Sequence, residues 1–239
     1  MKSELNKVYF EEKNDIGYVV INDPPANKMS AVFLEEFNIM VRKYIAKSSV
    51  KGIIISGKGR HYSSGADVEL IKEIVATQCI LDDNDNLIAY PIWYLINRTS
   101  FDFFNNLNIP VISAVNGLCF GSGFELAMCS HIRICGKGSL LALPESTFGF
   151  LPGLTGTLLA VELIGLGQAL ELVLSGETIS ADEAMEIGLI DGVVNKKETL
   201  SYCEELMKFI LKDEKPYSKK YINQYLENFN KNYKNISIT

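Results

Sequence analysis

The sequence has few of the residues that form metal sites, disulfide frameworks or nucleic-acid-binding surfaces. Its 239 residues include two histidines and five cysteines, an odd number without a C-x-x-C pair, which argues against a zinc site and a disulfide framework. We therefore expect no metal and reduced cysteines that pack in the interior. Basic residues number 23 against 29 acidic ones, and the resulting net charge of -6 disfavours nucleic acid and anionic membranes as partners.

The sequence also lacks an apolar leader and a long apolar run. Residues 1–4 are mostly polar, and no run approaches the ~20 apolar residues of a transmembrane helix. We expect a cytoplasmic protein without a membrane partner. Hydrophobic residues make up 47% and charged residues 22%, which is typical of one large globular domain with a small appendage. We place the core at residues 1–195 and a C-terminal helical region at 196–239.

Apolar periodicity predicts an α/β protein. The expected strands are 8–12, 16–21, 52–57, 109–115, 131–135, 139–145 and 189–194. The expected helices are 30–47, 68–74, 92–107, 124–128, 155–164, 167–174, 181–187, 198–211 and 217–233. We interpret residues 77–91 as an irregular solvated loop, because their acidic run lacks the glycine and the closing glutamate of an EF-hand. The aromatic residues of 92–107 are interpreted as core.

A glycine turn in the middle of the chain is the first candidate for chemistry. Gly121 and Gly123 flank Ser122, directly after a buried strand and before a helix that carries Glu125. Glycine lets the backbone approach a ligand closely, and the free amides at a helix start bind an oxygen that develops negative charge. Apolar neighbours predict a raised pKa for Glu125, which favours a role as acid or base.

A second turn repeats this arrangement. The segment Gly57–Asp67 follows the strand 52–57 and precedes an apolar helix, so the amide of Ala66 is a second candidate donor. Another acid, Glu145, follows Pro144 at the end of a strand, where ligands bind in layered α/β proteins. Two aimed amides and two acids in apolar surroundings are what oxyanion or enolate chemistry at a thioester carbonyl requires.

Other motifs fit poorly. A dinucleotide-binding G-x-G-x-x-G that began at Gly121 would have Leu126 in place of its third glycine, and no G-K-[ST] loop is present. No G-x-S-x-G elbow accompanies His61 or His131, so a serine-hydrolase triad is not indicated and both histidines are interpreted as structural.

The ordered motifs resemble those of the crotonase family, also called the enoyl-CoA hydratase/isomerase family, from about Val8 to Lys196. They are Asn22-x-Pro24-Pro25-x-Asn27, Tyr62–Asp67, Asn116-Gly117 with Gly121–Ala127, Pro144-Glu145 with Gly149–Gly153, Leu174–Ala184 and Gly188–Asp191. The resemblance implies a spiral of repeated ββα units with a C-terminal helical segment, usually assembled as a trimer or a hexamer. It also implies an acyl thioester of coenzyme A as the substrate and no separate cofactor.

By the same resemblance, the backbone amides of Ala66 and Ser122 form the oxyanion hole. Glu125 activates the water, and Glu145 positions it and exchanges the proton at the α-carbon. Further substrate-binding positions carried over from the family are Ala26, Lys28, Gly65, Asp67, Val68, Gly121, Pro144 and Leu151.

The resemblance leaves the reaction open. The filled glutamate pair favours a hydratase that adds water to, or removes it from, a 2-enoyl or 3-hydroxyacyl thioester. Glu69 and the long segment between Asp67 and Asn116 favour isomerisation or decarboxylation, with an acyl carrier protein and its phosphopantetheine arm as a candidate partner. His131 and Leu154–Thr157 depart from the usual pattern, and the C-terminus is short for the family. A catalytically silent subunit of the same fold is the third reading.

Overall fold

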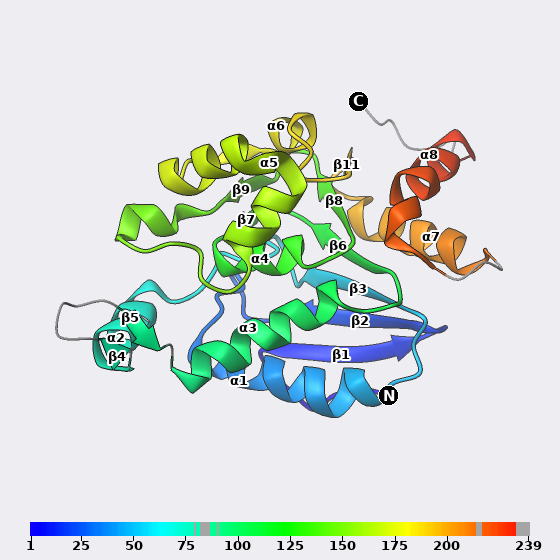
Figure 1. Ribbon diagram of the computed structural model, residues 1–239. Coiled ribbons are helices and arrows are strands. Elements are labelled where there is room, and N and C mark those ends of the chain that lie inside the picture. Colours follow the sequence, from blue (N-terminus) through cyan, green and yellow to red (C-terminus); the bar gives the residue numbers. More distant parts are fainter. Residues whose placement is uncertain (79, 82–86, 90, 214–216, 233–239) are drawn as a thin grey trace.

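The computed structural model describes residues 1–78, 80–81, 87–89, 91–213 and 217–232. Its centre is a six-stranded sheet (Figure 1) in the order β1-β2-β3-β6-β8-β11. Only the pair β1–β2 is antiparallel, and each later neighbour is parallel. The strands are β1 Val8–Lys13, β2 Ile16–Ile21, β3 Gly52–Gly57, β6 Val111–Val115, β8 Ile132–Gly136 and β11 Gly192–Val194.

Local sequence explains the hairpin and the buried strands. Asn14 and Asp15 both have positive φ values, 52° and 66°, as a two-residue turn between antiparallel strands requires. The apolar strand β3 lies between two parallel neighbours and is buried over Gly52–Ile55. A strand covered on both faces needs apolar residues in succession, which is the pattern that predicted it.

Helices cover both faces of this sheet. On one face, the aromatic rings of α1 (Ala31–Ile39) and α3 (Ile92–Asn105) enter the main core, where Phe37 packs 5.1 Å from Phe101 between ring centroids. The Ser30 side chain caps α1 by accepting a hydrogen bond from the amide of Phe33. On the other face, α7 (Thr199–Leu211) and α8 (Ile222–Asn232) form a second core with the sheet.

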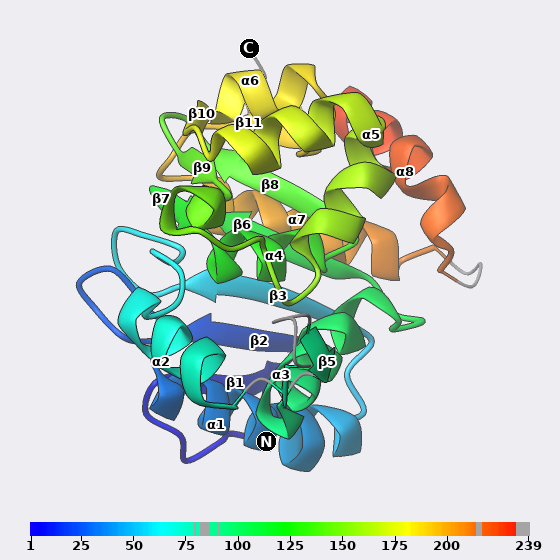
Figure 2. The same cartoon turned by 60° about the vertical axis from the view of Figure 1, so that its left-hand side comes forward.

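A smaller sheet lies beside the main one, in the order β10-β9-β7. Its strands are β7 Leu118–Phe120, β9 Leu140–Ala142 and β10 Ile179–Ser180, and the helices near it are α4 Ser122–Met128, α5 Gly156–Ser175 and α6 Ala181–Glu186. Figures 1 and 2 place α5 and α6 at the opposite end of the molecule from α1. The expected mixed α/β class is confirmed.

Two expectations about long segments need correction. The segment expected to be an irregular loop contains two short paired strands, β4 Ile80–Leu81 and β5 Leu87–Ala89, because apolar residues flank its polar centre. Residues 82–86, which suggested the loop, lie outside the described part of the chain. The helix expected over residues 68–74 is longer than predicted, because α2 extends over Val68–Gln78.

The α5 helix bears on the expectation that no segment spans a membrane. By length and composition it is the one described helix long and apolar enough to cross a membrane, with 28% of its most apolar 18-residue window buried. Its backbone is not continuous, because Gly165 adopts φ 76° and ψ 166°. The two helices expected on either side of this glycine are therefore present, and each is shorter than a bilayer requires.

Candidate active site

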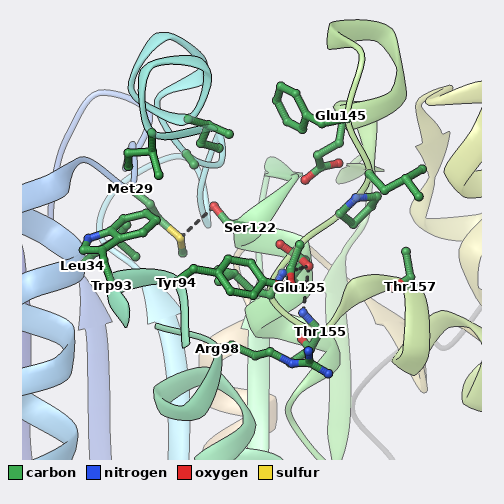
Figure 3. Close-up of a pocket in the computed structure, with 18 of the residues that line it drawn as sticks. Met29, Leu34, Trp93, Tyr94, Arg98, Ser122, Glu125, Glu145, Thr155 and Thr157 are labelled. Carbon is green, nitrogen blue, oxygen red and sulfur yellow. Dashed lines mark hydrogen bonds between the residues drawn. The ribbon is translucent and has the colours of Figure 1, made fainter. Parts of the chain in front are cut away.

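One cavity of about 580 Å³ contains both predicted acids (Figure 3). Its walls come from α2, α3, the start of α4, the Glu145 segment and the residues that lead into α5. The lining residues are Met29, Leu34, Ala66, Leu70, Ile71, Ile74, Pro91, Trp93, Tyr94, Arg98, Ser122, Glu125, Glu145, Phe150, Leu151, Pro152, Gly153, Leu154, Thr155, Thr157 and Leu158. Most are apolar, so the few polar groups that face the cavity decide its chemistry.

The N-terminus of α5 holds the carboxylate of Glu125. Glu125 is 2% exposed, and its Oε1 accepts hydrogen bonds from the amides of Leu154, Thr155 and Gly156 at 2.9, 2.9 and 2.8 Å. These amides have no partner within the helix, and the helix dipole favours negative charge at this end. The segment that departs from the family pattern is therefore what fixes Glu125.

Close packing at Gly156 adds to this fixation. A Cβ atom at Gly156 would lie 2.9 Å from Glu125 Cγ and 3.0 Å from Glu125 Oε1. Ordinary carbon contacts are about 3.5 to 4.0 Å. Only glycine at this position allows the carboxylate to approach all three amides.

Glu145 has a different environment. It is the second residue of a short 3₁₀ helix, Pro144–Phe148, which follows β9 after one residue, and it is 8% exposed. Its Oε2 has no hydrogen-bond partner among the described residues. Its Oε1 lies where a Cβ at Gly121 would be 3.0 Å away, so Gly121 makes room for it. An unpartnered buried carboxyl oxygen is costly unless the group is neutral or binds a ligand.

The two glutamates titrate as a pair. Burial raises the pKa of Glu125, and the three amide donors oppose that effect by stabilising the carboxylate. Burial, and then the negative charge of Glu125, raise the pKa of Glu145 to about 8. The three amides thus favour the carboxylate form of Glu125, and the surroundings of Glu145 favour its protonated form.

Ala66 and Ser122, the residues of the two predicted amide donors, both line this cavity. Ser122 is the first residue of α4 and follows Gly121, whose φ is 51°. Neither amide donates a backbone hydrogen bond to any residue in the described part of the chain. The two turns are in contact, because a Cβ at Gly65 (φ 88°) would lie 2.7 Å from Phe120 O and 3.5 Å from the Cα of Gly121. Residue 65 must therefore be glycine, because its φ is positive and because a side chain would collide with the neighbouring turn.

The cavity lining includes one of the eight further binding residues that the family resemblance implies. Leu151 is that residue. Lys28 and Asp67 form an ion pair at 2.8 Å, which lowers the pKa of Asp67. The remaining residues, Ala26, Gly65, Val68, Gly121 and Pro144, are not among the described lining residues, and their roles stay predictions.

Sequence reasoning missed the contribution of α3. Its aromatic residues were expected in the core, which holds for Phe101 and Phe104, but Trp93 and Tyr94 line the cavity together with Arg98. The Tyr94 hydroxyl donates to the carbonyl of Gly153. The i, i+4 spacing of Tyr94 and Arg98 places both on one helix face, but it does not indicate that this face borders a cavity.

Neither histidine belongs to the cavity. His61 Nδ1 accepts from the amide of Leu118 at 3.0 Å, and His131 stacks on Tyr217 at 5.5 Å between ring centroids. Burial lowers the pKa of His131 to about 4, so it is neutral at neutral pH. Within the described ranges, no cluster of ligating side chains could hold a metal, and the four described cysteines are buried free thiols. Cys79 lies outside these ranges.

Known proteins that resemble this chain indicate its family. The family model for enoyl-CoA hydratase/isomerase matches residues 11–238. A Bacillus subtilis (strain 168) protein named "probable enoyl-CoA hydratase" is 34% identical over 203 residues, 84% of this chain and 75% of that protein. The short-chain-enoyl-CoA hydratase of Clostridium acetobutylicum is 32% identical over 205 residues, 85% of this chain and 74% of that protein.

Longer relatives and solved structures also match. The chain covers 28% of the fatty acid oxidation complex subunit alpha of Idiomarina loihiensis, at 34% identity. The crystal structure of an enoyl-CoA hydratase from Bacillus anthracis has a TM-score of 0.73 and 26% identity, over 94% of this chain and 83% of that one. Matched over most of its length in sequence and in fold, this chain belongs to the enoyl-CoA hydratase/isomerase family.

Proposed function

We propose that this enzyme adds water to a 2-enoyl thioester of coenzyme A, and removes it in the reverse direction. The observation that carries the proposal is the glutamate pair, in which three backbone amides donate to Glu125 and Glu145 keeps a buried oxygen without a partner among the described residues. Hydration needs one group that accepts a proton from water and one that delivers a proton to carbon. The amide donors suit the Glu125 carboxylate to accept a proton, and the raised pKa of Glu145 suits that acid to deliver one.

In the proposed reaction, the amides of Ala66 and Ser122 donate to the thioester oxygen. The Glu125 carboxylate takes a proton from a water molecule while its oxygen forms a bond to the β-carbon. The carbon–carbon double bond shifts its electrons towards the thioester, and the α-carbon takes the proton of Glu145. The two acids then hold one proton as before, now on Glu125, and solvent exchange restores the starting state. The amides stabilise the negative charge that develops on the thioester oxygen.

Isomerisation or decarboxylation on the same scaffold is the alternative. Moving a double bond requires only a proton shuttle, for which one of the two glutamates is sufficient. Hydration is favoured by two acids in different surroundings, one that stabilises the carboxylate of Glu125 and one that raises the pKa of Glu145. Glu69 is a weaker argument for the alternative than its charge suggested, because it is exposed and paired with Lys72 at 3.1 Å. An acyl carrier protein in place of coenzyme A belongs to this alternative.

Assembly into a trimer or hexamer is part of the proposal. Large apolar side chains remain exposed along α5, namely Leu158, Val161, Leu166, Leu170 and Leu174. Their spacing places Leu166, Leu170 and Leu174 in one row along the helix. Contiguous exposed apolar surface of this kind marks an interface. The buried thiols fit a reducing compartment, and we place the protein in the cytoplasm.

The test follows the loss of ultraviolet absorbance after the pure protein is mixed with each of a panel of conjugated 2-enoyl-CoA thioesters. We expect fast loss by the wild type and a loss of activity of at least about 10²-fold for Glu125→Gln and for Glu145→Gln. Folded variants with wild-type activity would contradict the assigned roles. No reaction with thioesters of coenzyme A or of a carrier protein would overturn the hydratase.

A further inference from the structure

A cation without a partner lies in the apolar cavity. Arg98 is half-buried, lines the cavity, and forms no ion pair or hydrogen bond with any residue in the described ranges. The acid one turn further along α3, Asp102, is engaged by the side chain of Asn106 at 2.8 Å. The charge of Arg98 acts on the carboxylate of Glu125, but Glu125 Oε1 is occupied by three amides and the two side chains form no ion pair. The guanidinium is therefore available to a ligand.

The position of Arg98 relates it to one part of the substrate. Figure 3 draws Arg98 below Thr155 and Glu125, on the side away from Glu145. In the proposed reaction, Glu125 delivers water to the β-carbon, so the rest of the acyl chain begins beside Glu125. The phosphates of coenzyme A are attached beyond the thioester, on the other side of the carbonyl. Arg98 thus faces the distal end of the acyl group.

Desolvation makes this position selective. A guanidinium keeps its hydration while the cavity is filled with water, but an apolar acyl chain would displace that water and offer no partner in return. A carboxylate at the chain end would accept two parallel N–H bonds from the planar guanidinium. Arg98 therefore weakens the binding of neutral acyl chains and strengthens the binding of acyl chains that end in a carboxylate.

We propose that Arg98 forms a carboxylate-binding subsite, and that the acyl group of the substrate ends in a carboxylate. The inference rests on the proposed thioester site and names its substrate class, a dicarboxylic 2-enoyl monothioester. It assigns Arg98 to specificity and not to proton transfer.

Equilibrium binding of saturated thioesters tests the subsite without any reaction. Calorimetry would compare coenzyme A thioesters in length-matched pairs, butanoyl with succinyl, pentanoyl with glutaryl and hexanoyl with adipoyl. We expect the wild type to bind the acidic member of at least one pair about tenfold or more tightly. Arg98→Gln should abolish this preference, and Arg98→Lys should retain part of it.

A matched control separates the subsite from general electrostatics. Arg42 is exposed, and Arg42→Gln makes the same change of charge away from the cavity. This variant should keep the wild-type preference. Wild-type preference for the neutral member of every pair, or equal weakening of both members in Arg98→Gln, would overturn the subsite. If neither the acidic nor the neutral thioesters bind, both the subsite and the proposed thioester site are overturned.

Hydration of the matching unsaturated pair distinguishes the two proposals. If the acidic thioesters bind preferentially but neither 2-pentenoyl-CoA nor glutaconyl-CoA is hydrated, the hydratase fails and the subsite stands. If both are hydrated with equal kcat/KM, and Arg98→Gln lowers both rates equally and shifts the pH profile, Arg98 acts through Glu125 and the subsite fails.

Discussion

A methyl group at residue 156 should disable the enzyme while leaving it folded. In Gly156→Ala the new Cβ would meet Glu125 Cγ at 2.9 Å, Glu125 Oε1 at 3.0 Å and Pro152 Cβ at 3.0 Å. Relief of these contacts requires a shift of the carboxylate by roughly 0.5 to 1 Å. A shift of that size in a catalytic group costs about 10²-fold in rate. The amide of residue 156 remains, so the perturbation is steric.

The same substitution should have a small effect on the free energy of unfolding. Alanine in a helix is favoured over glycine by roughly 0.5 to 1 kcal/mol. Overpacking costs about 1 to 3 kcal/mol, so the net loss is at most about 2 kcal/mol. We expect a fall in kcat of about 10²-fold with little change in KM, because the interaction acts in the transition state. Absorbance kinetics and urea unfolding measure the two quantities.

Gly167 provides the matched control within the same helix. A Cβ there would meet nothing within 4 Å. Gly167→Ala should therefore leave kcat unchanged and raise the free energy of unfolding by roughly 0.5 to 1 kcal/mol. Light scattering would verify that both variants keep the wild-type oligomeric state. A Gly156→Ala variant with kcat within about threefold of wild type would refute the reasoning that α5 positions Glu125.

Three further predictions concern the oxyanion donors, the glutamate pair and the apolar face. Ser122→Pro removes the amide hydrogen at the first helical position, where proline is tolerated, and should lower kcat by about 10² to 10³, whereas Ser122→Ala keeps the amide and should stay within severalfold. Because the pKa of Glu145 rises from 4.5 to about 8 on folding, its contribution to stability is present below 4.5 and is lost as pH rises through 8. Urea unfolding should therefore show wild type losing up to about 4 kcal/mol more than Glu145→Gln between pH 5 and 9, and equal losses would contradict the raised pKa. Leu170→Asp should dissociate the assembly in sedimentation, and an unchanged mass would exclude α5 from the interface.

Much of the fold could be predicted because its signals are local. The Ser30 cap, the turn at Asn14 and Asp15 and the break at Gly165 each act within a few residues, and each appears where the sequence places it. The apolar run of β3 predicted a strand covered on both faces, which the parallel sheet confirms. The short hairpin of β4 and β5 escaped prediction because three or fewer residues in a strand give too little pattern.

The site was predictable in its parts but not in its connections. The two acids and the two amides could be named from the glycine turns and the strand ends. The hydrogen bonds that hold the Glu125 carboxylate could not be predicted, because Thr155 lies 30 residues further along the chain and contacts Glu125 only in the folded protein. The position of Arg98 at the cavity could not be predicted either, because the apolar periodicity of α3 does not indicate which of its faces borders a cavity.

The most direct test of hydration by the glutamate pair is a single turnover of crotonyl-CoA in deuterium oxide, with the product analysed by nuclear magnetic resonance. The mechanism predicts a 3-hydroxybutanoyl thioester with one deuterium at the α-carbon, formed by the wild type and by neither Glu125→Gln nor Glu145→Gln. A double bond moved to the β,γ position without a hydroxyl group, or product formed equally well by either variant, would contradict it.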